Sequence, residues 1–139
     1  MTRDKSNPRS RGAVPADAVV PLNSFAEVQN FITQVLTQNG EASGVTTSPH
    51  GSFWTTLSYR DFVTGVVPHV TDPNSGQPIP VLVKGDSAHS NLIFSLQGKG
   101  PLFDPAVGSI GQMPANGPPM FTDQQIASIA AWIDAGCPE

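Results

Sequence analysis

The feature that most constrains this fold is a pair of capping boxes, one near each end of the chain. Ser24 is followed by Glu27 and Thr122 by Gln125, so each hydroxyl can accept from a helical amide while its partner reaches back to the cap. Each box precedes apolar residues at helical spacing: Val28, Phe31, Ile32 and Val35 in one case, Ile126, Ile129, Ala130 and Ile133 in the other. The sequence therefore predicts helices over 24–38 and 122–135, buried against each other.

The segment between these helices is rich in turn formers, since the chain holds 14 Pro and 13 Gly. We expect short inner helices near residues 56–64 and 87–97, a long turn-rich loop over 65–80 and an extended run over 79–83. Within that loop, Asp72-Pro-Asn-Ser-Gly76 is a strong turn signal. The predicted fold class is mostly α, with long Pro/Gly-rich loops.

Charge and composition divide the chain in two. Residues 1–20 are polar and lack apolar periodicity, which predicts a flexible basic arm before a single domain at 21–139. The whole chain carries a net charge of −4, of which the first twelve residues contribute +3, so the remainder is at −7. An acidic body argues against nucleic acid as a partner, because phosphate binding needs clustered Lys and Arg.

No segment has the features of a membrane or export signal. Residues 12–22 form no apolar core of a signal peptide, and no stretch is long and apolar enough to span a bilayer. We expect a cytoplasmic protein, or a periplasmic or exported one if a leader was removed before this numbering begins. The single cysteine, Cys137, fits either location because it has no partner for a disulfide.

Several motifs together resemble a known family. Residues 113–122 read Met-Pro-Ala-Asn-Gly-Pro-Pro-Met-Phe-Thr, and residues 129–138 read Ile-Ala-Ala-Trp-Ile-Asp-Ala-Gly-Cys-Pro. Their order resembles the C-terminal third of small c-type cytochrome domains. Residues 83–94 and 57–65 are similar to the family's inner helical segments, so the resemblance covers roughly residues 24–138. It implies a cytochrome c-like fold in which the N- and C-terminal helices pack across each other.

The chain departs from that family at the haem-attachment motif. A c-type cytochrome carries Cys-x-x-Cys-His, whose two thioethers hold the haem. Here the corresponding segment reads Thr46-Thr-Ser-Pro49-His50, so the histidine remains without either cysteine. The resemblance implies that His50 and Met113 occupy the family's axial positions on haem iron. Attachment through thioethers is chemically excluded.

These observations leave three functions open. The first is a haem-free cytochrome c-like domain that acts as an accessory or interaction module for a protein partner or larger complex, or that binds a small apolar ligand. Its pocket residues would be Phe53, Trp54, Tyr59 and Met120, although the aromatic ones could equally pack in the core. The rival is an electron-transfer protein that binds haem non-covalently through His50 and Met113. The third is an enzyme that reuses the vacated haem cavity.

Metal binding and catalysis have weaker support in the sequence. His50, His69 and His89 match no compact metal-ligand spacing, so we expect no metal site. Ser, His and Asp are present without a nucleophile-elbow motif, and no catalytic residue is predicted. Cys137 has no base close to it in sequence and is interpreted as a small residue tolerated where the family often has Ala.

Overall fold

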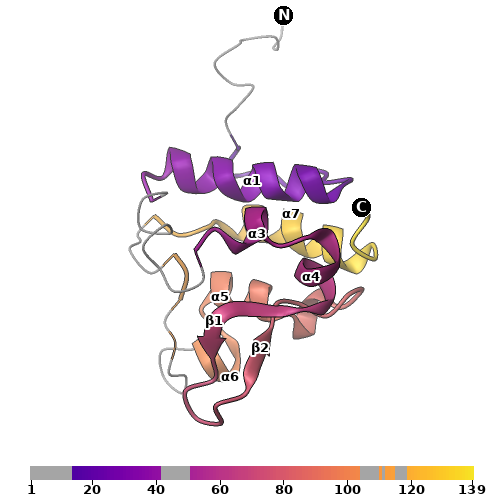
Figure 1. The fold of residues 1–139 in the computed structure, drawn as a ribbon. Coiled ribbons are helices and arrows are strands. Elements are labelled where there is room, and N and C mark those ends of the chain that lie inside the picture. The colour runs from indigo at the N-terminus through magenta and orange to yellow at the C-terminus, as the bar shows by residue number, and fades with distance from the viewer. Residues whose placement is uncertain (1–13, 42–50, 104–109, 111, 115–118) are drawn as a thin grey trace, which may run out of the picture.

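A computed structural model of the chain describes residues 14–41, 51–103, 110, 112–114 and 119–139 (Figure 1). Helices and one small sheet follow in the order α1 (Phe25–Gln38), α3 (Phe53–Thr56), α4 (Tyr59–Thr64), β1 (Val66–Thr71), β2 (Pro78–Pro80), η2 (Ser87–His89), α5 (Asn91–Gln97), α6 (Gly100–Phe103) and α7 (Asp123–Asp134). The predicted mostly-α class is confirmed. Among the described helices, none has the length and apolar character needed to cross a bilayer.

The two terminal helices begin at the predicted caps. The Thr122 hydroxyl accepts from the Gln125 amide at 3.2 Å, and the Gln125 side chain accepts from the Thr122 amide at 3.0 Å, which completes the box. At α1 the Ser24 hydroxyl accepts from the Glu27 amide, but the Glu27 carboxylate takes the Asn23 amide at 2.9 Å. Both helices thus start through local side-chain bonds that replace missing helical partners.

Replacing Thr122 by Ala tests the cap of α7. This change removes the hydroxyl that accepts from Gln125 and also donates to the Ala16 carbonyl at 2.5 Å. We expect a loss of about 1 kcal/mol in the free energy of unfolding, as for other N-caps. Urea denaturation measures it, with Thr122→Ser as the control because Ser keeps the hydroxyl. Equal urea midpoints for wild type and Thr122→Ala would show that the cap does not contribute to stability.

Glycines end the helices where the sequence predicts. At the end of α1, Gly40 adopts φ 75°, and its amide donates to Thr37 while the next amide, of Glu41, donates to the Leu36 carbonyl. These two bonds form a Schellman motif, which requires a left-handed residue. Gly98 ends α5 in the same conformation, with φ 68°.

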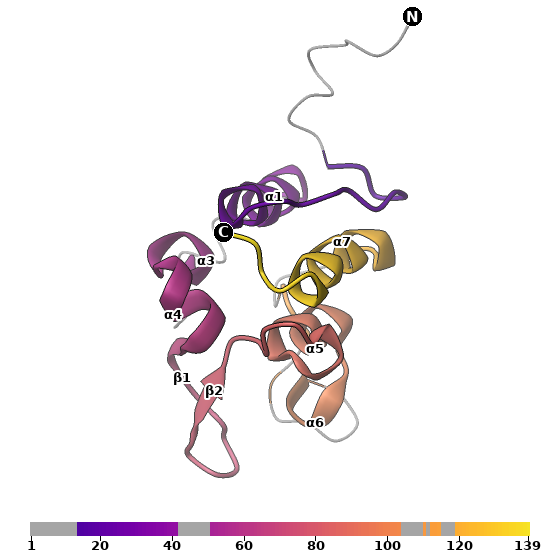
Figure 2. The same cartoon turned by 90° about the vertical axis from the view of Figure 1, so that its right-hand side faces the viewer.

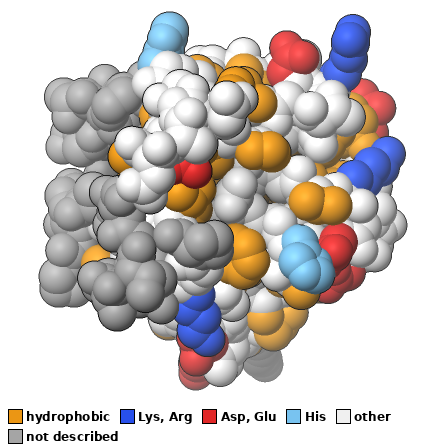
Figure 3. Space-filling view, turned by 90° about the horizontal axis from the view of Figure 1, so that it is seen from below, with side chains coloured by type: hydrophobic (Ala, Val, Ile, Leu, Met, Phe, Trp, Pro, Cys, Tyr) orange, Lys and Arg blue, Asp and Glu red, His pale blue; other side chains and the backbone are white. Residues whose placement is uncertain are grey.

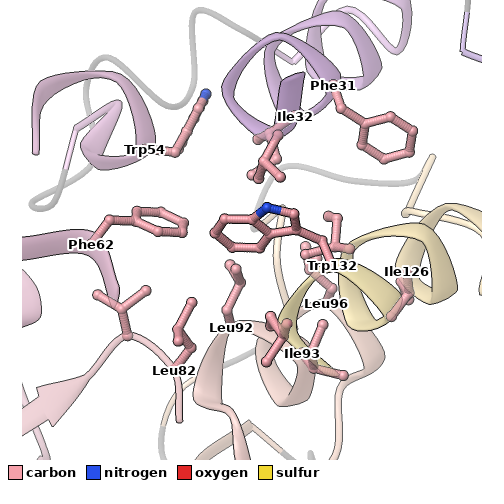
Figure 4. Close-up of a cluster of buried hydrophobic side chains, with 14 of the residues drawn as sticks. Phe31, Ile32, Trp54, Phe62, Leu82, Leu92, Ile93, Leu96, Ile126 and Trp132 are labelled. Carbon is pink, nitrogen blue, oxygen red and sulfur yellow. The ribbon is translucent and has the colours of Figure 1, made fainter. Parts of the chain in front are cut away.

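An aromatic cluster joins the two ends of the chain. The rings of Phe25, at the start of α1, and Trp132, near the end of α7, have centroids 6.4 Å apart, and both contact Phe62 of α4. The Phe25 amide donates to the carbonyl of Glu139, which brings the last residue to the start of α1. Figure 4 shows the Trp132 indole in the middle of the core, between Phe62 and α7. The two terminal helices therefore meet through this aromatic pair, where the start of α1 lies beside the end of α7 (Figures 1 and 2).

The segment predicted as a loop over 65–80 contains a strand. β1 pairs antiparallel with β2, in the register Val66 to Pro80 and Thr71 to Pro78, and the predicted turn at Asp72 connects them. The prediction of a loop was wrong for β1 because Pro and Gly dominate the segment. A Pro is compatible with a strand whose outer edge is unpaired, since its missing amide is then not needed.

The predicted inner helices are present but shorter or divided. The one near 56–64 is α4, with α3 as a separate turn before it. The one near 87–97 is divided at Ser90, whose backbone is extended (φ −92°, ψ 125°). Its buried hydroxyl donates to the Asp86 carbonyl at 2.8 Å and accepts from the Val83 amide at 2.9 Å. These bonds to the segment just before it hold Ser90 in an extended conformation, which interrupts the helix.

The described part of the expected N-terminal arm lies on the helices. The Val14 amide and carbonyl both bond to the Gln38 side chain of α1, at 2.9 and 2.8 Å. The Val20 amide donates to the Ser128 hydroxyl of α7 at 2.8 Å. Residues 14–20 thus connect α1 to α7, whereas residues 1–13 lie outside the described part of the chain.

Candidate functional site

Of the two candidate axial residues, the structure describes only Met113. His50 lies outside the described residues. The Met113 amide donates to the Ser95 carbonyl of α5 at 2.8 Å, and the Gln112 side chain donates to the Leu96 carbonyl at 2.9 Å. Two bonds therefore hold this segment along α5, and the half-buried Met113 packs against the core.

Met113 borders a cavity of about 60 Å³ between the β1–β2 hairpin and α5. The side chains around it come from distant parts of the sequence: Phe53, Val67, Val70, Ile79, Val81, Asn91, Leu92, Ser95, Phe103, Ile110 and Met113. Phe103 belongs to α6, a short helix that the sequence analysis missed because residues 99–117 lack periodicity. The cavity therefore depends on β1 and α6, two elements absent from the sequence prediction, and on β2, which overlaps the extended run predicted over 79–83.

The described residues that line this cavity include no group for acid–base catalysis. None of its described residues is ionisable, and both polar side chains already donate to backbone carbonyls: Asn91 to Pro80 at 3.0 Å and Ser95 to Leu92 at 2.7 Å. General acid–base chemistry needs a titratable group within hydrogen-bond reach of the reacting atom. The geometry therefore suits binding of an apolar group and offers no proton donor or base among the described walls.

The four predicted pocket residues separate in the structure. Phe53 lines the cavity, and Trp54, Tyr59 and Met120 are not among its walls. Trp54 is buried beside α1, where its indole donates to the Thr33 hydroxyl at 3.0 Å. The alternative interpretation, that large aromatics here fill the core, thus describes Trp54 better than the pocket interpretation.

Tyr59 and Cys137 meet at the end of the chain, away from the cavity. The Tyr59 hydroxyl donates to the Cys137 carbonyl at 2.5 Å, and the Cys137 amide donates to the Trp132 carbonyl at 3.0 Å. Cys137 is buried, and burial raises the pKa of its thiol. A protonated, buried thiol is a poor nucleophile, so Cys137 acts in packing, as the sequence predicts.

The two described histidines lie apart from the cavity walls. His89 is exposed and its Nδ1 lies 2.7 Å from the Asp86 carboxylate. His69 is exposed on β1 and has the left-handed φ of 60°. Within the described ranges, no three His, Cys, Asp or Glu side chains gather as metal ligands do. A site that includes His50 lies outside what the structure describes.

A buried carboxyl that the sequence did not predict follows the end of α1. Glu41 is 2% exposed, and neither of its carboxylate oxygens has a hydrogen-bond partner among the described residues. Burial raises the pKa of this carboxyl above its ordinary value. No sequence signal marks it, because a Glu after an Asn-Gly helix stop is usually solvated.

The described residues fit haem only in part. Met113 offers a thioether at an apolar wall, as an axial ligand must. The cavity of about 60 Å³ is smaller than the engineered cavity of ~150 Å³ that takes benzene, so a porphyrin needs far more room than these walls leave. As arranged here, the site does not fit a macrocycle.

No protein-family model, curated protein or solved structure matches this chain. The resemblance to c-type cytochromes accordingly rests on the order of the motifs between residues 24 and 138.

Proposed function

We propose that this chain is a cytochrome c-like domain without covalent haem that serves as a module for binding a small apolar ligand. The observation that carries the proposal is the apolar cavity where Phe53 and Met113, predicted separately as pocket and ligand residues, lie together. Binding sites for small molecules are typically concave, mostly apolar and formed by several elements. An accessory role in a larger complex is compatible with this module, and its partner would be a protein.

The rival function is non-covalent haem binding with electron transfer. Met113 favours it, because the resemblance implies the family's axial methionine at this position and Met113 lines the cavity. The size of the cavity favours the proposed module, because haem would have to displace several side chains that are now packed. Dense cores resist such displacement, since each lost contact costs dispersion energy.

Expression in haem-supplemented cells distinguishes the two functions. We expect a colourless protein and, on haem titration, no Soret band that depends on His50 or Met113. His50→Ala should then be about as stable as wild type in thermal unfolding. The rival function predicts instead a Soret band that His50→Ala and Met113→Ala abolish.

The control variants are His69→Asn and His89→Ala, since both histidines are exposed and lie outside the cavity lining, and Asn tolerates the left-handed φ at position 69. A haem spectrum retained equally in all four variants would indicate nonspecific association. A spectrum lost only with His50 and Met113 would overturn the proposed haem-free function.

A further inference from the structure

We propose that a bulge at His69 in β1 shapes this cavity for a small, uncharged, apolar molecule. The inference rests on the function proposed above and adds the chemical class of the ligand and the residue that determines the shape of the wall. Its basis is the path of β1, the strand that contributes Val67 and Val70 to the lining.

The alternation of side chains between the two faces of β1 is interrupted at His69. In a regular strand, alternate side chains point to opposite faces, so Val67 would share its face with residue 69 and Val70 would point the other way. Here Val67 and Val70 both line the cavity, and His69 between them is exposed. Side-chain alternation is therefore broken between Val67 and Val70.

The backbone explains this break. Five steps along β1, from Val66 to Thr71, pair with only two steps along β2, from Pro80 to Pro78, so β1 carries extra residues. His69 has φ 60°, a left-handed conformation that residues other than Gly seldom adopt. Such a residue in an irregular strand is the mark of a bulge, which redirects the side chains that follow it.

The same geometry restricts the ligand. The Asn91 amide and the Ser95 hydroxyl already donate to carbonyls, and no charged side chain is among the described lining. A charged ligand would lose its water without gaining an opposite charge among these residues, which is unfavourable. At about 60 Å³ the space takes a molecule of a few atoms.

The surface near the hairpin agrees with an apolar ligand. Figure 3 looks onto the lower end of Figure 1, where the hairpin and α6 lie, and shows apolar side chains in a broken patch across the middle. Most charged side chains in this view lie nearer its rim.

Xenon is a suitable probe, because it is small, uncharged and without hydrogen-bonding groups, and methyl NMR of the full chain reports where it binds. We expect saturable shifts at the methyls of Val67, Val70 and Met113. Val66 is the internal control, since it belongs to the same strand but is 44% exposed and absent from the lining. Methylammonium, small but charged, should shift none of them.

Substitutions at position 69 test the bulge. His69→Gly and His69→Asn tolerate a left-handed φ and should bind xenon within about twofold of wild type. His69→Val disfavours that conformation, and we expect at least a tenfold weaker xenon affinity and loss of the Val70 shift. Circular dichroism checks that each variant is folded. The difference between the xenon-induced shifts at Val70 and Val66 is measured in the wild-type protein, so it tests the assigned wall even if a variant does not fold.

The outcomes separate the two proposals. If wild type shows no saturable xenon shift at these methyls, the ligand-binding module itself fails. If wild type binds but a folded His69→Val binds equally well, the bulge does not determine the wall and this inference fails alone. If Val66 shifts as strongly as Val70, or methylammonium competes with xenon, the assigned wall or ligand class is wrong.

Discussion

Replacing Trp132 by Ala is expected to cost about 3–5 kcal/mol of unfolding free energy, as large-to-small changes at buried aromatics do. Trp132 is 1% exposed, and its ring contacts Phe25 and Phe62, which belong to α1 and α4. Its removal leaves a cavity where three helices meet. Because small domains are stable by only about 5–15 kcal/mol, the variant should be near its unfolding threshold at room temperature.

Urea unfolding followed by circular dichroism measures this loss. Trp132→Phe is the partial variant: it keeps an aromatic ring but loses the indole bond to the Pro138 carbonyl, at 2.9 Å, and should cost about 1–3 kcal/mol. Val19→Ala is the control, because Val19 is 55% exposed and surface changes stay within about 0.5 kcal/mol. A Trp132→Ala midpoint equal to that of Val19→Ala would contradict the central place of this side chain.

Replacing Glu41 by Gln is expected to stabilise the protein at neutral pH. The carboxyl of Glu41 is buried without a hydrogen bond of good geometry among the described residues, and burial raises its pKa in the folded state by more than the Asn39 side chain lowers it. An unpaired buried polar group costs about 1–3 kcal/mol, and a charged one costs more. Gln cannot ionise, so we expect a gain of about 1 kcal/mol at pH 7.

The sign of the pH dependence follows from proton binding. Between the unfolded and the raised folded pKa, the native state holds more protons than the unfolded chain, so stability falls as pH rises. Glu41 therefore destabilises the fold above its folded pKa and is harmless below the unfolded value. The difference in unfolding free energy between Glu41→Gln and wild type should grow from acid to neutral pH and then level off.

Denaturant titrations from pH 4 to pH 8 measure this difference. Glu27→Gln is the control, since Glu27 is an exposed carboxylate of α1, the helix that Glu41 follows, and Gln keeps an acceptor for the Asn23 amide. Its difference from wild type should stay small throughout. A Glu41→Gln difference that is flat with pH would show that the carboxyl is not perturbed by burial.

The helices of this fold could be predicted because their ends are local. The capping bonds at Ser24, Thr122, Gly40 and Gly98 span six residues or fewer, and the structure places each of these residues at the predicted helix end. The burial of Ile126, Ile129 and Ile133 follows from their spacing alone. Strand β1 could not be recognised in this way, because its partner β2 is what turns a Pro-containing run into a strand.

The candidate site was predicted less completely than the fold. Phe53 and Met113 were both singled out, and the structure places them around one cavity. Trp54 and Tyr59 belong to other contacts, with Thr33 and Cys137, that no local pattern indicates. An aromatic residue that lies near a candidate haem-ligating residue in the sequence can belong to a pocket or to the core, because its ring is buried in either place.

Sequence alone indicates the mostly-α class, the limits of α1 and α7 and the absence of a Cys-x-x-Cys-His motif, since each depends on residues close together in the chain. The tertiary structure alone decided the phase of β1 at His69, the isolation of the Glu41 carboxyl and the cavity between the hairpin and α5. The physical reason is sequence distance. The alternation of side chains along β1, the burial of the Glu41 carboxyl and the shape of the cavity depend on which distant elements pack together. Short-range sequence patterns do not specify that packing.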